Sequence, residues 1–122
     1  MAWDVEEIPN QDRVFYRVHR THRTLGPSIF REQEGAMSTD WEKYSTPEES
    51  RGRARIPADN GIVALQAGEI RSVPGLSLTH TPLNENRSHA DVVGIGTGGP
   101  DTTKRRLLLF QATNPVWLLT IG

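Results

Sequence analysis

The chain has 122 residues, of which 35% are hydrophobic and 24% are charged, as expected for one globular domain over residues 1–122. Its net charge of -1 excludes a general attraction to nucleic acid, and the lack of cysteine excludes disulfides, thiolate nucleophiles and sulfur-ligated zinc. Because the acidic N-terminus has no signal-peptide pattern and no apolar run approaches the roughly 20 residues that span a bilayer, we expect a cytoplasmic protein without membrane association.

The first predicted element is a strand over residues 13–19. Val14, Tyr16 and Val18 alternate with other positions in the period-two pattern of a strand, which places Arg17 and His19 on the opposite face. The surrounding segment is basic, because residues 13–31 contain five arginines, two histidines and no acid. Arginine forms bidentate contacts with carboxylate and phosphate, so this segment points to an anionic ligand.

The middle of the chain predicts one helix within irregular structure. After a turn at Gly26–Pro27 we expect a short extended piece over residues 28–31, and residues 34–45 are expected to be irregular. Thr46 then supplies a helix N-cap, with a proline in the first turn and a glutamate that completes a capping box. This helix is predicted to end at about Arg55.

The second half predicts short strands separated by turns. The expected strands are residues 61–66, 76–80, 89–94 and 116–121, and one helical turn is expected over residues 67–72. Residues 104–112 fit either a helix capped by Asp101 or Thr102 or a strand. The pattern predicts an α+β fold, with a mixed or antiparallel sheet of short strands and two modest helices in a single domain.

The four histidines are the first candidates for chemistry. His19 and His22 form an H-x-x-H pair, but on one strand they would point to opposite faces. His80 shares a face with two leucines, which favours a buried, hydrogen-bonded side chain. His89 shares a face with Asp91, whose carboxylate would select the imidazole tautomer. We therefore expect structural or surface roles, and neither a metal site nor a cofactor.

A glycine-rich segment over residues 94–99 matches G-x-G-x-x-G and follows a predicted strand. A dinucleotide-binding fold also needs a second parallel strand and an acid roughly 20 residues further on, and no acid follows Asp101. A mobile loop is the simpler interpretation. A local nest of amides that binds phosphate is left open.

A third group combines Arg17 and His19 with Ser38 and a downstream acid, either Glu69 or Glu85. This combination is loosely similar to ADP-ribosyltransferase-like folds, and that similarity implies binding of a nicotinamide nucleotide and its ribose. The alternative is a solvated basic sheet face.

Several longer segments carry a more specific resemblance. VFYRVHRTH, FREQEGAMSTDWEKYSTPEES, NGIVAL and HTPLNENRSHADVVG together resemble a family of short uncharacterised bacterial proteins. That family has a Y-R strand, an M-S-x-D-x-x-x-Y-S-x-P-E-E segment and an N-x-x-H-A/S-x-V strand. The resemblance implies a bacterial or phage origin and a single-domain fold, but no activity. It directs attention to Arg17, Ser38, Asp40, Tyr44, Ser45, Asn86 and His89.

The leading functional hypothesis is an accessory protein that binds a protein partner through exposed Trp41 and Tyr44. Tryptophan, tyrosine and arginine dominate binding hot spots, which motivates that choice.

The alternative is a small enzyme that acts on a nucleotide or RNA by ADP-ribosyltransferase-like or phosphodiester chemistry. Arg17 would hold phosphate, His19 or His89 would act as acid or base, and Ser38 would orient the substrate. Convergence of Arg17, Ser38 and His89 in one pocket favours this enzyme, and an exposed apolar patch favours the accessory protein. A third hypothesis, plain nucleic-acid or nucleotide binding, would use the arginines of the basic segment: Arg13, Arg17, Arg20 and Arg23.

Overall fold

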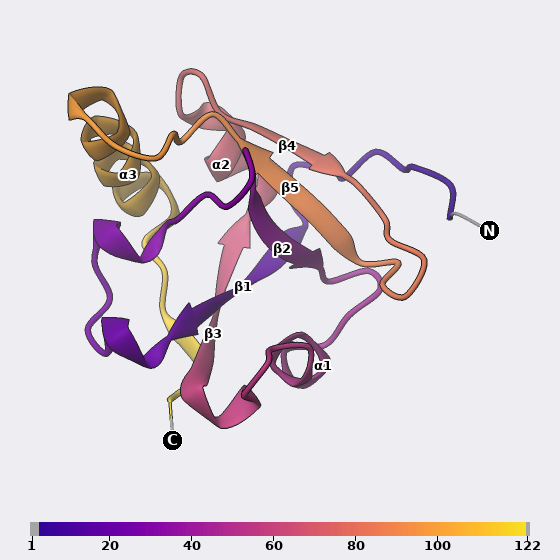
Figure 1. Ribbon diagram of the computed structural model, residues 1–122. Coiled ribbons are helices and arrows are strands. Elements are labelled where there is room, and N and C mark those ends of the chain that lie inside the picture. The colour runs from indigo at the N-terminus through magenta and orange to yellow at the C-terminus, as the bar shows by residue number, and fades with distance from the viewer. Residues whose placement is uncertain (1–2, 122) are drawn as a thin grey trace.

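Six strands form one sheet in the computed structural model, which describes residues 3–121 (Figure 1). The strands are β1 (Arg13–His19), β2 (Met37–Trp41), β3 (Asn60–Gln66), β4 (Ser77–His80), β5 (His89–Val93) and β6 (Trp117–Leu119). Their order is β4-β5-β2-β1-β3-β6, and every neighbouring pair is antiparallel. The expected α+β fold is confirmed, and of the two sheet types the antiparallel one forms.

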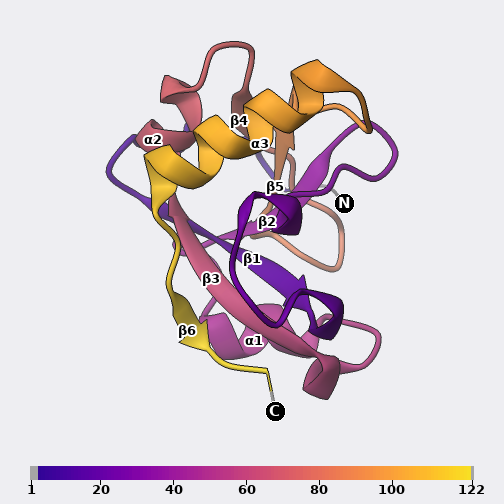
Figure 2. The ribbon, with the colours of Figure 1, turned by 90° about the vertical axis from the view of Figure 1, so that its left-hand side faces the viewer.

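Helices cover both faces of this sheet. They are α1 (Pro47–Gly52), α2 (Ala67–Ser72) and α3 (Pro100–Thr113), with single 3-10 turns η1 (Arg20–His22), η2 (Pro27–Ile29) and η3 (Pro57–Asp59). Helices α2 and α3 pack together on one face, whereas α1 lies on the other (Figures 1 and 2). Within residues 3–121 no helix has the length and apolar content needed to cross a bilayer.

The predicted strand over residues 13–19 is confirmed as β1, together with its two-faced pattern. Val14, Tyr16 and Val18 lie in the main core beneath α2 and α3. Phe15 points to the other face, where it is buried on the side that α1 covers. Burial of these aliphatic and aromatic groups supplies the main stabilising free energy, about 25 cal/mol for each Å² of apolar surface removed from water.

The two sides of β1 are paired very differently. On one side it forms a continuous ladder with β3, from Arg13–Gln66 to His19–Asn60. On the other side it pairs with β2 only at Val14–Trp41 and Phe15–Asp40. In the described chain the ladder stops there, although the same register would next bring Tyr16 opposite Thr39 and then Arg17 opposite Ser38. The two central strands therefore diverge, and a cleft opens between them.

Helix α1 follows the sequence-based expectation closely at its start. The Thr46 hydroxyl accepts a hydrogen bond from the Glu49 amide at 3.1 Å, and the Glu49 carboxylate accepts one from the Thr46 amide at 2.9 Å. This is the predicted capping box. The helix ends at Gly52, three residues before the expected Arg55.

Three local expectations are wrong. Within residues 34–45, which were expected to be irregular, residues 37–41 form β2. Of the expected extended piece over residues 28–31, Ser28 and Ile29 instead belong to η2, and Phe30 is extended. The signal for β2 was hidden because its buried face includes Thr39, whose hydroxyl donates to the Ala90 carbonyl at 2.9 Å. Residues 104–112 are helical, but the cap is Gly99 rather than Asp101 or Thr102.

Candidate functional site

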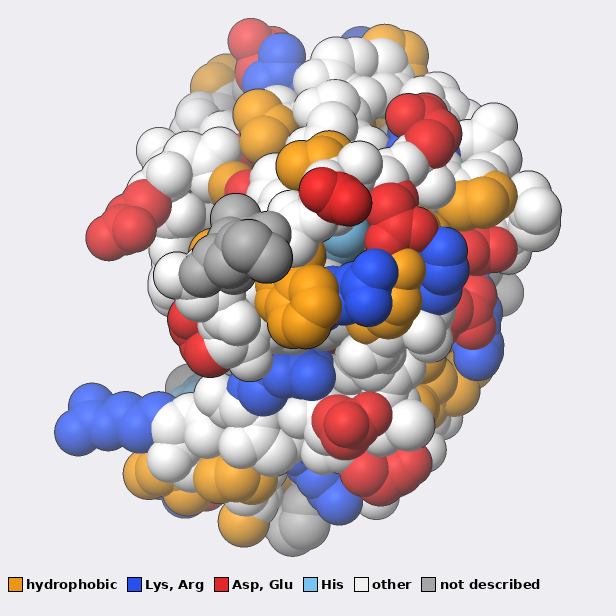
Figure 3. Space-filling model, turned by 90° about the vertical axis from the view of Figure 1, so that its right-hand side faces the viewer, with side chains coloured by type: hydrophobic (Ala, Val, Ile, Leu, Met, Phe, Trp, Pro, Cys, Tyr) orange, Lys and Arg blue, Asp and Glu red, His pale blue; other side chains and the backbone are white. Residues whose placement is uncertain are grey.

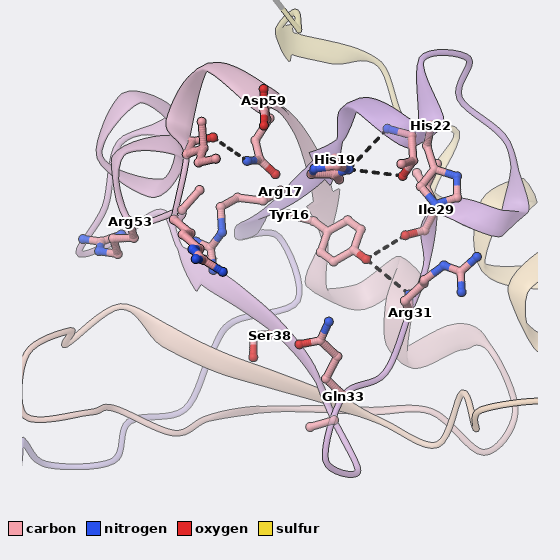
Figure 4. A pocket seen from close by; sticks show the side chains of 16 residues that line it. Tyr16, Arg17, His19, His22, Ile29, Arg31, Gln33, Ser38, Arg53 and Asp59 are labelled. Carbon is pink, nitrogen blue, oxygen red and sulfur yellow. Dashed lines mark hydrogen bonds between the residues drawn. The ribbon is translucent and has the colours of Figure 1, made fainter.

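The cleft between the diverging halves of β1 and β2 has a volume of about 1140 Å³. Its walls come from β1, η1, the 29–36 segment, β2 and the 53–60 segment that follows α1 (Figure 4). The arginine, histidine and aspartate side chains that line it are Arg17, Arg31, Arg53, Arg55, His19, His22 and Asp59.

Asp40 organises the wall nearest to α1. Its side chain is 2% exposed, and its Oδ2 lies 3.0 Å from Nη1 of Arg17 and 3.3 Å from Nη1 of Arg53. Both arginine side chains remain more than a quarter exposed. Arg17 also donates to the Ser50 carbonyl at 3.1 Å, and Arg53 donates to the Ser45 hydroxyl at 2.9 Å. Two arginines are thus held in place by one carboxylate.

Three neutral side chains complete the hydrogen bonds of Asp40. Ser50 Oγ donates to Oδ2 at 2.5 Å, while Asn86 Nδ2 and Ser88 Oγ donate to Oδ1 at 2.8 and 3.2 Å. Burial alone would raise the pKa of Asp40, but these hydrogen bonds and the two arginine charges outweigh it and hold the pKa below its usual value. Asp40 is therefore a permanent anion at neutral pH.

The charge of the cleft is nevertheless positive. Arg17 and Arg53 share the single negative charge of Asp40, which leaves an excess positive charge at that wall. Asp59 is the other acid at the cleft, and it lies 3.9 Å from Arg20. Arg31 and Arg55 form no ion pair within the described residues. A protein with a net charge of -1 thus concentrates cationic groups at one place.

One tyrosine and two histidine side chains lie at the far end of the cleft. The Tyr16 hydroxyl donates to the Ile29 carbonyl at 2.6 Å, and burial raises the pKa of Tyr16, so this phenol stays neutral. His19 Nδ1 accepts from the Thr21 amide at 3.3 Å, which leaves its Nε2 for a ligand. Burial, with help from nearby positive groups, lowers the pKa of His22 and keeps that imidazole neutral at pH 7.

Ser38 lies on the β2 side of the cleft and His89 on the neighbouring strand β5. Ser38 is exposed, and its Oγ lies 3.3 Å from Nε2 of His89. The other ring nitrogen, Nδ1, lies 3.0 Å from both the hydroxyl and the carbonyl oxygen of Thr81. Serine and histidine are therefore in hydrogen-bond contact at the edge of the basic cleft.

The structure brings together the four side chains that the sequence singled out for catalysis. Arg17, His19 and Ser38 line one cleft, and His89 contacts Ser38. The other arginines considered for nucleic-acid binding do not line it: Arg13 pairs with Glu42, Arg20 lies near Asp59, and Arg23 is exposed elsewhere.

The exposed aromatic patch expected around Trp41 and Tyr44 is not formed. Trp41 is 1% exposed because it is a core residue, and its indole N–H donates to Asp12 at 3.0 Å. Tyr44 is half-buried, with its ring edge-on to Trp41 and its hydroxyl bonded to Glu6. The polar residues around Trp41 in the sequence suggested an exposed side chain, but Trp41 packs in the core.

Neither downstream acid reaches the cleft. Glu69 lies in α2 and Glu85 in the β4–β5 loop, and neither lines it. Without such an acid, the similarity to ADP-ribosyltransferase-like folds is limited to Arg17 and Ser38.

The amide nest considered for the glycine-rich segment is already occupied. The amides of Gly94 and Ile95 donate to the same Glu32 carboxylate oxygen at 3.0 and 2.9 Å. These contacts fasten the 27–36 segment to the end of β5.

Sequence reasoning missed three arginines of the cleft. Arg53 and Arg55 follow α1, where they were assigned to the end of a helix, and Arg31 was counted only as part of the basic segment. The R-x-R spacing after a capped helix was the available signal for the first two.

Comparisons with known protein families, curated proteins and solved structures find no match to this chain. Among residues 3–121 no group of three or more histidine, aspartate or glutamate side chains is placed to hold a metal ion.

Proposed function

We propose that this domain is a small enzyme that binds the phosphate groups of a nucleotide, either free or within RNA, in the basic cleft. A bacterial or phage origin and a cytoplasmic location, suggested by the family resemblance and by the lack of cysteine, belong to the same proposal. Four arginines and two histidines against one peripheral acid favour an anionic ligand, and the planar guanidinium group matches phosphate oxygens in a bidentate manner.

The observation that carries the proposal is the shared anchoring of Arg17 and Arg53 on buried Asp40. Each guanidinium uses Nη1 for its protein contacts and remains partly exposed at the cleft. Because the anchoring is already present without ligand, little side-chain entropy is lost when these groups bind phosphate. Ordinary surface arginines have no such anchor, so this arrangement is typical of a binding site.

The test measures fluorescence anisotropy of a labelled six-nucleotide single-stranded RNA, with ADP as a competitor, for the wild type and for Arg31→Ala and Arg55→Ala. Both arginines are exposed and line the cleft, so we expect their loss to leave the fold intact. A hydrogen bond to a charged group contributes about 1.5–3 kcal/mol, which corresponds to a loss of roughly tenfold or more in affinity. The slope of log K against log salt should fall by about 0.7 for each lost phosphate contact of RNA.

The matched control is Arg23→Ala, which removes the same charge from a position outside the cleft. Its affinity should stay within about twofold of the wild type. Equal losses in all three variants would mean a diffuse charge effect and would contradict the cleft as the site. RNA binding without competition by ADP would assign the cleft to the polymer, and the reverse would assign it to the free nucleotide.

Binding of a protein partner is a second proposal, supported at a different place from the one expected. Trp3 is 44% exposed, and the Arg87 guanidinium lies 4.8 Å from its ring centroid and 4.0 Å from that of Tyr44. Apolar and basic side chains lie side by side on the corresponding side of the molecule (Figure 3). If a partner docks there, a crosslinked complex formed by the wild type should be lost in Trp3→Ser and kept in Arg23→Ala. Retention in Trp3→Ser would contradict this surface.

A further inference from the structure

Ser38 and His89 have the relative placement of a nucleophile and its base. They lie on adjacent strands of one sheet, where Ser38 pairs with Asp91 and Asp40 pairs with His89, so serine and imidazole are diagonal neighbours on the same face. The Oγ–Nε2 distance is 3.3 Å. Contacts between catalytic groups are commonly this long before a substrate is bound.

The surroundings of His89 select the tautomer that a base requires. Nδ1 lies 3.0 Å from the Thr81 carbonyl oxygen, which can only accept a hydrogen bond. Nδ1 therefore carries the proton and donates it to Thr81. Nε2 is then the atom with the free lone pair, and it faces the Ser38 hydroxyl, which donates to it. Thr81 has the orienting role that a third group has in known serine–histidine pairs.

Asp91 favours the charged form of this imidazole during reaction. Its Oδ1 lies 3.8 Å from Nε2 of His89, too far for a hydrogen bond but close enough for charge stabilisation. Positive charge develops on His89 when it takes the serine proton, and the carboxylate stabilises that charge. The charged groups nearest to this pair are Asp91 on β5, Asp40, which pairs with His89 across the β2–β5 ladder, and, across the cleft, Arg17.

We propose that Ser38 is a catalytic nucleophile, activated by His89, that attacks a phosphate ester held by the cleft arginines; the substrate class rests on the proposed function above. Ser38 on β2 and Arg17 on β1 line the cleft from the two strands that diverge around it. The hydroxyl thus faces the same cleft as the arginine that would bind the phosphate.

The proposed reaction consumes only the phosphate ester and water. Ser38 Oγ forms a bond to phosphorus as its proton moves to Nε2 of His89, the ester P–O bond breaks, and the leaving oxygen takes the electron pair and then the proton from His89. Water, deprotonated by His89, attacks the phosphoserine in the second step. The Oγ–P bond breaks, and the serine oxygen regains a proton from His89.

A fluorophosphonate probe tests nucleophilicity without requiring nucleotide binding. Serine Oγ displaces fluoride from such a probe, and the adduct on the Ser38 peptide is identified by mass spectrometry. We expect labelling of the wild type at Ser38, none at this peptide in Ser38→Ala, and a rate at least tenfold lower in His89→Asn. Asp91→Asn should show a smaller decrease.

The control is Ser77→Ala, which removes an exposed serine from β4, and it should label at the wild-type rate. Thermal unfolding of each variant shows whether it is folded. An unlabelled Ser38 in the wild type, or equal rates in folded His89→Asn and the wild type, would overturn the nucleophile. RNA and ADP binding are measured on the same samples. Binding of RNA or ADP without labelling of Ser38 would contradict the nucleophile but leave the proposed function standing. Labelling of Ser38 without binding of RNA or ADP would support the nucleophile but contradict a phosphate ester as its substrate.

Discussion

Asp40 shows how much one side chain contributes to both structure and site. It is almost completely buried, it receives hydrogen bonds from three neutral side chains, and it anchors two arginines that face the cleft. A buried ion pair is rarely a large source of net stability, but removing one member leaves the other charge without compensation. At this position the same carboxylate therefore supports the fold and orients two arginines at the cleft.

Asp40→Asn should lower the free energy of unfolding by about 3–5 kcal/mol, because Arg17 and Arg53 lose the charge that compensates them. Urea denaturation followed by tryptophan fluorescence measures this change. Asp91→Asn is the matched control, since Asp91 is 24% exposed and makes only a long contact with His89. Its effect should stay below about 1 kcal/mol. Similar changes in the free energy of unfolding for the two variants would contradict the stabilising role of Asp40.

The lowered pKa of Asp40 also predicts a pH dependence of stability. A carboxyl whose folded pKa lies below its unfolded value binds fewer protons in the native state, so its contribution is complete above the ordinary pKa of 3.8. The contribution is lost as the pH falls from there through the lower folded pKa. Unfolding midpoints measured between pH 6 and 2 should fall less steeply in that window for Asp40→Asn than for Glu85→Gln, an exposed control. Parallel curves would contradict the assignment.

At the scale of elements, the sequence predicted those structures whose signals are local. The alternation in residues 13–19 and the capping box after Thr46 depend on neighbours a few positions apart, and both are confirmed. Strand β2 was missed because its buried polar residues find their partners 46 to 51 positions away, on β5 and the loop before it. The same reason limits prediction of the site. Arg17 and Ser38 were identified, but their common cleft depends on where the β1–β2 ladder stops.

The loop after β5 has a conformation that only glycine allows at one position. Gly94 has φ +115°, and a Cβ there would overlap the carbonyl oxygen of Gly75. Gly94→Ala should therefore cost at least about 2 kcal/mol of unfolding free energy, from backbone strain and steric overlap, and should loosen the contact with Glu32. Gly98→Ala is the control, because a Cβ at Gly98 meets nothing within 4 Å. Thermal unfolding compares the two, and an equal shift would contradict this explanation.

At the scale of the whole molecule, the charge distribution matters more than the total. The chain carries a net charge of -1, yet the cleft gathers four arginines, while acids such as Glu6 and Glu42 pair with cations elsewhere. The net charge correctly excluded a protein whose whole surface is basic, but it gave no information about a local concentration of arginines. That concentration is created by folding, which brings the basic segment of β1 and η1 against the arginines that follow α1.

The short ladder between β1 and β2 divides the sheet into two half-sheets, β4-β5-β2 and β1-β3-β6. Two residue pairs join them directly, and the bonds around Asp40 join them again. The cleft occupies the seam where the next backbone pairs would have formed. A ligand bound there would contact residues of both half-sheets. On the proposed function, ligand binding should therefore hold the two half-sheets together.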